Sequence, residues 1–69
     1  MFVKLTNNFD DRKDDPIFIN VNHIIAVYED RTDGGSLVTK VYGGTAEAVI
    51  WVVQESLGQV LKKIEEASK

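Results

Sequence analysis

Near its end the chain contains the segment Ala48-Val49-Ile50-Trp51-Val52-Val53-Gln54-Glu55-Ser56, which says most about the fold. A strand with one face in water alternates apolar and polar residues, so an unbroken apolar run predicts a strand with both faces covered. A chain of 69 residues has few other elements with which to cover two faces. We therefore expect this strand to be central in a sheet or to lie at an interface, most simply with a second copy of the chain.

The segment that follows has the pattern of an amphipathic helix over residues 57–67. Ser56 and Gln59 have the spacing of a capping box, in which each side chain accepts a hydrogen bond from the other residue's backbone. Apolar residues then recur every three or four positions and form one stripe, made of Leu57, Val60, Leu61, Ile64 and Ala67. This stripe must pack on the sheet or on another chain.

Alternating β-branched and aromatic residues predict further strands at about residues 2–6, 17–20, 24–29 and 37–42, and the apolar strand spans about 45–53. Residues 20–23 suggest a kink, which leaves open whether 17–29 is two strands or one bent strand. Gly34-Gly35 and Gly43-Gly44 predict tight turns between antiparallel strands. The expected fold is α+β in a single domain, residues 1–69: an antiparallel sheet of four to five strands with one C-terminal helix.

Composition narrows the class of protein. The chain has no cysteine, so a disulfide framework and a thiolate zinc site are both excluded, and oligomerisation remains as a means of stabilising a small fold. Its net charge of −3 disfavours nucleic acid and anionic lipid as partners. We see no secretory signal and no apolar run near the roughly 20 residues of a membrane span, so we expect a cytoplasmic protein without membrane insertion.

The sequence contains few residues in patterns that indicate a catalytic, metal or cofactor site. The acidic residues between Asp10 and Asp15 lack the glycine and the closing glutamate of a calcium loop, and Arg12 and Lys13 lie among them, so we interpret this segment as a solvated loop. His23 is the single histidine and has no recognisable nucleophile motif around it. The glycine pairs match no phosphate-binding pattern. We therefore predict no catalytic residue, no metal site and no cofactor.

Aromatic residues could instead stack on bases, but the lysines are scattered along the sequence and frame no such platform. Trp51 is more typical of a core or interface anchor. The residues that we assign to the core or to an interface lie on the apolar strand and the helix stripe: Val49, Trp51, Val53, Leu57, Val60, Leu61 and Ile64.

Three pieces of the chain together resemble the small FlbD-like proteins found among bacterial flagellar genes. They are Lys4-Leu5-Thr6, then Asn20 with Ile24 and Val27, and then Val53-Gln54-Glu55-Ser56 followed by Val60 and Ile64. The chain departs from that family in its longer first loop, in the length of residues 44–53, and in Leu57, where a proline is common. The resemblance implies a small β-rich, non-enzymatic protein linked to motility, and it implies no catalytic residue.

The favoured function is a non-catalytic protein-interaction module that self-associates, with another protein as a further possible partner. An alternative is a small acidic inhibitor of the phage type, which blocks a host enzyme or a nucleic-acid-binding surface through the Asp10 to Asp15 loop. A third hypothesis is RNA binding in a groove between the subunits of a β-rich dimer. The acidic charge balance weighs against the third.

Overall fold

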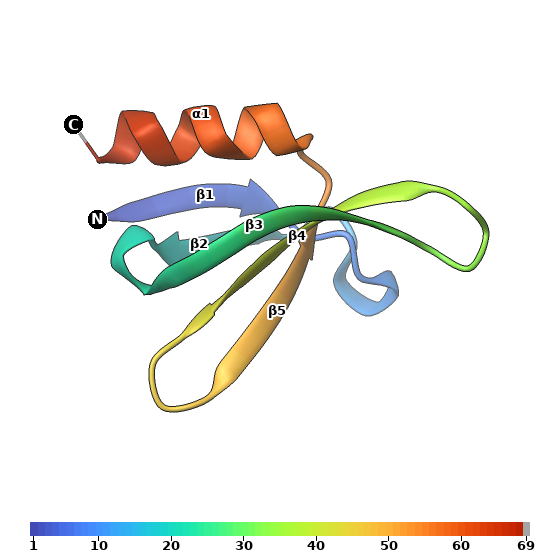
Figure 1. Ribbon diagram of the computed structural model, residues 1–69, viewed down its shortest axis with the longest axis horizontal. Helices are drawn as coiled ribbons and strands as arrows, with labels where there is room; N and C mark the ends of the chain where they lie inside the picture. The colour runs from blue at the N-terminus through green and yellow to red at the C-terminus, as the bar shows by residue number, and fades with distance from the viewer. Residues whose placement is uncertain (69) are drawn as a thin grey trace.

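The computed structural model describes residues 1–68, with the side chain of Asp10 excepted, and these residues form a mixed α+β fold (Figure 1). Five strands precede a C-terminal helix, and 3₁₀ turns at Asp10–Arg12 and Val21–His23 separate the first three strands. The elements are β1 (Phe2–Thr6), β2 (Pro16–Asn20), β3 (Ile24–Arg31), β4 (Leu37–Gly44), β5 (Ala48–Val53) and α1 (Leu57–Ala67). The α+β class is therefore confirmed.

The strands form two antiparallel sheets, and the expectation of a single sheet was wrong. β1 pairs with β2, and β3, β4 and β5 form a three-stranded meander. The turn at Val21–His23 separates the two sheets, because the Asn20 side chain accepts a 3.0 Å hydrogen bond from the Asn22 backbone N–H and the extended chain stops there. Residues 17–29 are thus parts of two strands in different sheets.

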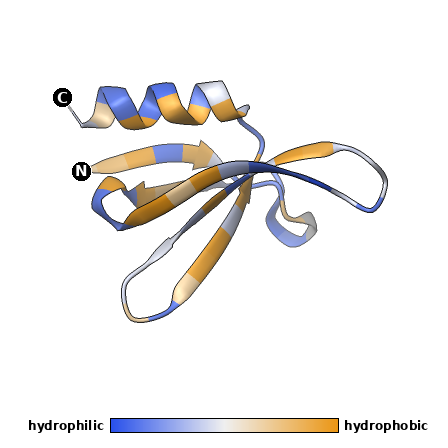
Figure 2. Ribbon diagram, viewed as in Figure 1, coloured by the Kyte–Doolittle hydropathy of each residue, from blue (hydrophilic) through white to orange (hydrophobic). Residues whose placement is uncertain are grey.

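A small core lies where the inner faces of both sheets meet one face of α1. Alternation along each strand places every second side chain inward, as in β1, where Val3 and Leu5 are buried and Lys4 is exposed. Among the described side chains, six hydrophobic ones are buried: Val3, Leu5, Ile19, Val41, Val53 and Val60. Figure 2 shows that hydrophobic colour also covers most of β5, whose first three residues are exposed.

Helix α1 lies over β1 and also packs against β3 of its own chain (Figure 1). The capping box is confirmed: the Ser56 hydroxyl accepts from the Gln59 N–H at 3.2 Å, and the Gln59 side chain accepts from the Ser56 N–H at 2.9 Å. Val60 is fully buried, while Leu61 on the margin of the stripe is 50% exposed. The stripe therefore covers its own protomer, and most of it is not free to cross to a neighbour.

The turn between β4 and β5 differs from the prediction. Gly43 and Gly44 are the last residues of β4, and the connection is residues 45–47, so β5 begins at Ala48 instead of residue 45. Glycine is required here for two other reasons. A Cβ on Gly43 would clash with the His23 carbonyl oxygen and lie 3.2 Å from the Trp51 ring, and Gly44 has a φ of +125°.

Candidate interaction surface

Strand β5 is an edge strand. It pairs with β4 along one side, and on its other side it meets the rest of residues 1–68 only at its end, through a bridge between Asn7 and Val53. The Asn8 N–H donates to the Val52 carbonyl at 2.9 Å there, and the strand then diverges from β1 (Figure 1). The run that we expected to be central in a sheet or at an interface is thus not central, and residues 48–51 have a free edge.

The apolar residues of β5 lie on both of its faces, as the sequence predicts. By register with β4, Val49, Trp51 and Val53 point to the inner side with Val41, whereas Ile50 points to the outer side. Burial increases along the strand, from Val49 and Ile50, which are 41% and 44% exposed, to Val53 in the core. The start of this apolar strand is therefore left in water by its own protomer.

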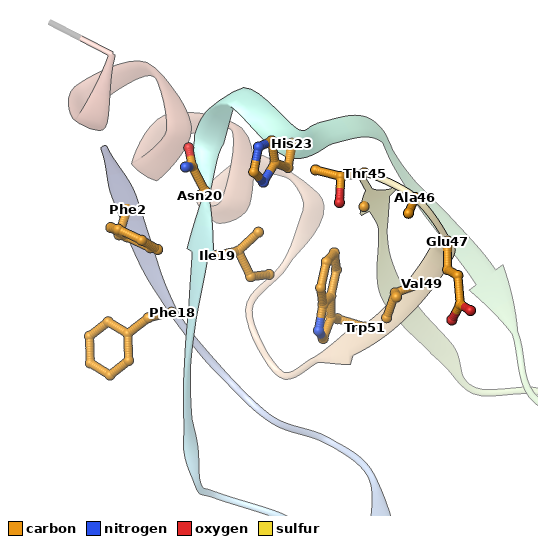
Figure 3. Close-up of a pocket in the computed structure, with 11 residues that line it drawn as sticks. Phe2, Phe18, Ile19, Asn20, His23, Thr45, Ala46, Glu47, Val49 and Trp51 are labelled. Carbon is orange, nitrogen blue, oxygen red and sulfur yellow. The ribbon is translucent and has the colours of Figure 1, made fainter.

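The inner side of this edge opens into a groove of about 550 Å³ between β5, residues 45–47 and β2. Figure 3 shows Ile19 and Trp51 in the space between the two strands, with Phe2 and Phe18 on the other side of the β2 ribbon. Phe2 and Phe18 are 63% and 62% exposed, which is unusual for side chains of this size. The groove is thus bordered by large apolar groups that the chain does not cover.

The outer face of the three-stranded sheet is also partly apolar. Register places Ala26, Tyr42 and Ile50 in one row across this face, and Tyr28 and Val52 stand in the next row. Ala26, Tyr28 and Ile50 are exposed. The prediction that both faces of the apolar strand are covered is therefore not met within one protomer, because the helix and the first sheet lie on the inner side.

The structure divides the seven predicted interface residues into three groups. Val53 and Val60 are in the core, where the chain's own sheets and helix enclose them, so of the two predicted roles these residues take the core one in the protomer. Trp51, Leu57 and Ile64 are half-buried, and Trp51 and Ile64 pack against the core. Val49 and Leu61 are exposed and remain available for contact.

Sequence reasoning missed Phe2 and Phe18 as surface residues. Register pairs Phe18 with Lys4 and Phe2 with Asn20, so both rings belong to the outer face of β1 and β2. The sequence did contain a sign of this exposure: Phe2 shares a strand face with the polar residues Lys4 and Thr6, and such a face normally points to solvent. That these rings lie beside the edge of β5 could not be read from either strand alone.

A hydrogen-bonded carboxylate joins the end of β5 to β1. Glu55 accepts from the Thr6 backbone N–H and from the Thr6 hydroxyl, each at 2.9 Å. Partial burial raises the pKa of Glu55, but these hydrogen bonds, with help from the Lys63 charge, hold the pKa below its usual value overall. The link keeps the two sheets together at the point from which β5 diverges.

A second groove, of about 570 Å³, gathers cations that are scattered in the sequence. Lys13, Arg31 and Lys40 all line it. Two of them already have partners: the Arg31 guanidinium donates to the Gly35 carbonyl at 3.0 Å, and Lys40 forms a 2.7 Å ion pair with Asp30. The hydrogen bond from Lys40 lowers the pKa of Asp30 and raises that of Lys40. The tertiary structure thus creates a cationic region that sequence spacing does not show.

The loop that contains the acidic residues is held in place by hydrogen bonds. The Asn7 N–H donates to the Asp15 carbonyl at 2.8 Å, and Gln54 donates to the Asn7 carbonyl at 2.9 Å and to the Asp14 carboxylate at 2.7 Å. Within the described part of the chain, no three acidic, histidine or cysteine side chains are placed to hold a metal ion.

Across residues 1–68 no helix has the length and apolar character to cross a membrane. Comparison of the chain with protein-family models, curated proteins and solved structures finds no match.

Proposed function

We propose that this chain is a non-catalytic protein-interaction module whose main partner is a second copy of itself. The observation that carries this proposal is the free edge of β5, where Val49 and Ile50 are 41% and 44% exposed on opposite faces of one strand. An uncovered apolar strand edge is a template for pairing with another chain. Association with a copy covers this edge without any further gene product.

The balance between core and surface supports the same proposal. Six buried hydrophobic side chains among those described make a small core, and domains of this size often depend on association for stability. The exposed large apolar residues are spread over several parts of the chain: Met1, Phe2, Phe9, Phe18, Ile25, Tyr28, Leu37, Val49, Ile50 and Leu61. Phe2, Phe18 and Val49 line one groove, and exposed apolar groups gathered in this way mark interaction sites.

Analytical ultracentrifugation over a range from nanomolar to high micromolar concentration tests self-association. We expect a reversible species of twice the 7.7 kDa monomer mass. Trp51 is the single tryptophan and is half-buried beside the edge, so its emission should shift to shorter wavelength as the dimer forms. A monomer at every concentration would refute the proposal. The link to motility that the FlbD-like resemblance implies stays a prediction.

The acidic inhibitor is a second candidate, because the loop that carries its carboxylates is fixed by hydrogen bonds to Gln54. Asp11 and Asp15 are exposed and can be changed without removing the Asp14 carboxylate that Gln54 uses. Reversal of both charges with Asp11→Lys and Asp15→Lys should leave self-association unchanged if the first proposal is right. Loss of binding to a cationic protein surface in the same variant would favour the second.

A further inference from the structure

The free edge of β5 carries backbone groups that point away from β4. The Val52 carbonyl accepts from the Asn8 N–H at 2.9 Å, so Val52 directs its backbone groups to the outer edge. These groups alternate along a strand with a period of two, and Ala48 and Ile50 therefore point the same way. Neither residue takes part in a backbone hydrogen bond outside the strand ladders of the described chain. Each offers one donor and one acceptor to another strand.

The β5 edge lacks the features that keep other edges from pairing. β5 contains no proline, no glycine and no charged residue, and its ladder with β4 has no register shift. By contrast, β2 begins with Pro16, and β3 has a bulge between Ile24 and Ala26 and ends in Glu29-Asp30-Arg31. Charges, prolines and bulges are the usual protection of an edge strand. Here the protection is present on β2 and β3 and missing on β5.

We infer that β5 pairs antiparallel with β5 of a second copy, about a two-fold axis at Val49. This inference rests on the proposed self-association and specifies its geometry. In this register Val49 faces the partner's Val49, and Ala48 faces the partner's Ile50. The outward backbone N–H and C=O groups of Ala48 and Ile50 then form four hydrogen bonds across the axis. Each Ala48 exchanges two of these bonds with the partner's Ile50. The two meanders join into one continuous six-stranded sheet.

Neighbouring registers are less favourable for reasons that the structure shows. An axis at Ile50 would pair Ala48 with the partner's Val52, whose carbonyl already accepts from Asn8 and whose edge is occupied by the bridge at Asn7. An axis at Ala48 would pair Ile50 with the partner's Ala46, which lies in the connection outside the strand. The axis at Val49 uses all the open backbone groups of residues 48–50 and needs none that is occupied.

This pairing also accounts for apolar residues on both faces of β5. On the inner face the two Val49 side chains meet next to Trp51, and on the outer face each Ile50 lies beside the partner's Ala48. A strand that is apolar on both faces is expected in the centre of a sheet. In the dimer β5 is central, although it is an edge strand in the protomer.

A single cysteine tests the register directly, because the natural chain has none. Residues that face each other in a non-hydrogen-bonded antiparallel pair have Cα atoms about 4.5 Å apart, which is within the range that a disulfide spans. We expect Val49→Cys to form a covalent dimer rapidly under mild oxidation. Ile50→Cys should do so poorly, because the two copies of residue 50 are offset by two positions and their Cα atoms lie more than about 7 Å apart.

Ile25→Cys is the matched control, since Ile25 is 68% exposed but lies on β3. It measures the rate of random collision between thiols. If ultracentrifugation shows a dimer and Val49→Cys crosslinks no faster than Ile25→Cys, the inferred register is wrong while the proposed function stands. If no dimer forms at any concentration, both are wrong.

A charge at the edge gives an independent test without a thiol. Ile50→Lys places an ammonium group at the inferred two-strand contact and should weaken dimerisation by about tenfold or more. Ile25→Lys adds the same charge to a still more exposed position on β3 and should leave dimerisation unchanged. Circular dichroism of both variants checks that the fold is kept. Equal effects of the two substitutions would overturn the inference.

Discussion

Glu55 is the residue whose replacement best tests how the two sheets are held together. Its carboxylate accepts from the Thr6 backbone N–H and the Thr6 hydroxyl at 2.9 Å, across 49 positions of sequence. Glu55→Gln keeps the size of the side chain but removes the charge and one of the two acceptor oxygens. Thr6→Val keeps the volume and removes only the hydroxyl donor.

The expected loss of unfolding free energy follows from the number of these hydrogen bonds and from their partial burial. A hydrogen bond contributes about 0.5–1.5 kcal/mol net, and more when one group is charged, but Glu55 is only partly buried and so lies at the lower end. We expect Glu55→Gln to lower the free energy of unfolding by about 1 kcal/mol, and Thr6→Val by about 1 kcal/mol. Since both remove the same hydroxyl contact, the double variant should lose less than the sum, by about 0.5 kcal/mol or more.

Urea unfolding followed by Trp51 emission measures these values, with all variants at one protein concentration because dimerisation adds to apparent stability. The matched control is Gln59→Glu, which keeps an acceptor in the capping box and changes the charge of a different side chain. Additive costs for Glu55→Gln and Thr6→Val, or no cost for Glu55→Gln, would show that the carboxylate does not hold β1 to the end of β5.

The same residue gives a pH dependence with a definite sign. The pKa of Glu55 is lower in the folded protein than its ordinary value, so its ionised form stabilises the fold. This contribution is fully present above the ordinary pKa of about 4.3 and is lost as the pH falls through the lowered pKa of the folded state. The difference in unfolding free energy between the natural chain and Glu55→Gln should therefore shrink as the solution is acidified below that ordinary pKa.

Three further predictions concern the core, the β4 end and the helix cap. Val60→Ala should lower the unfolding free energy by about 2 kcal/mol, because Val60 is fully buried. Leu61→Ala, at a half-exposed site, should lower it by less than half as much. Equal losses for the two variants in urea unfolding would contradict the placement of the helix stripe. Gly43→Ala should cost more than about 2 kcal/mol or prevent folding, because the added methyl meets the His23 carbonyl, and a circular dichroism melt close to that of the natural chain would contradict this close approach. Ser56→Ala should cost about 1 kcal/mol through loss of the hydroxyl that caps α1, while Ser56→Asp should retain most of the stability; thermal unfolding of the two variants gives the comparison.

Local chemistry was readable from the sequence at several points. The Ser56 and Gln59 spacing predicted the start of α1, and the capping box is formed in the structure. Alternation in β1 predicted Val3 and Leu5 on one face, and both are buried. These features depend on residues within one or two turns or one strand, so the period of the pattern is enough to find them.

Other features were misjudged because they depend on which strands lie beside each other. Gly43 and Gly44 resemble a turn, yet they are the last residues of β4. Glycine is needed at position 43 because the His23 carbonyl approaches closely, and at position 44 because the backbone has a positive φ. The patterns around Val53 and Val60 fit a core or an interface equally well, and it is the packing of both sheets and α1 that places the two residues in the core. Nothing within either segment specifies these distant neighbours.

Side-chain patterns along the chain were enough to locate the five strands and the helix approximately and to identify their apolar faces, including both faces of residues 48–53. The arrangement of these elements in space was needed to show that the fold has two sheets, that β5 is an edge strand, and that Phe2 and Phe18 border a groove beside β5. The pattern of side chains along a strand depends on which of its faces is buried. Which strand lies next to its edge depends instead on backbone hydrogen bonding between segments that are distant in sequence.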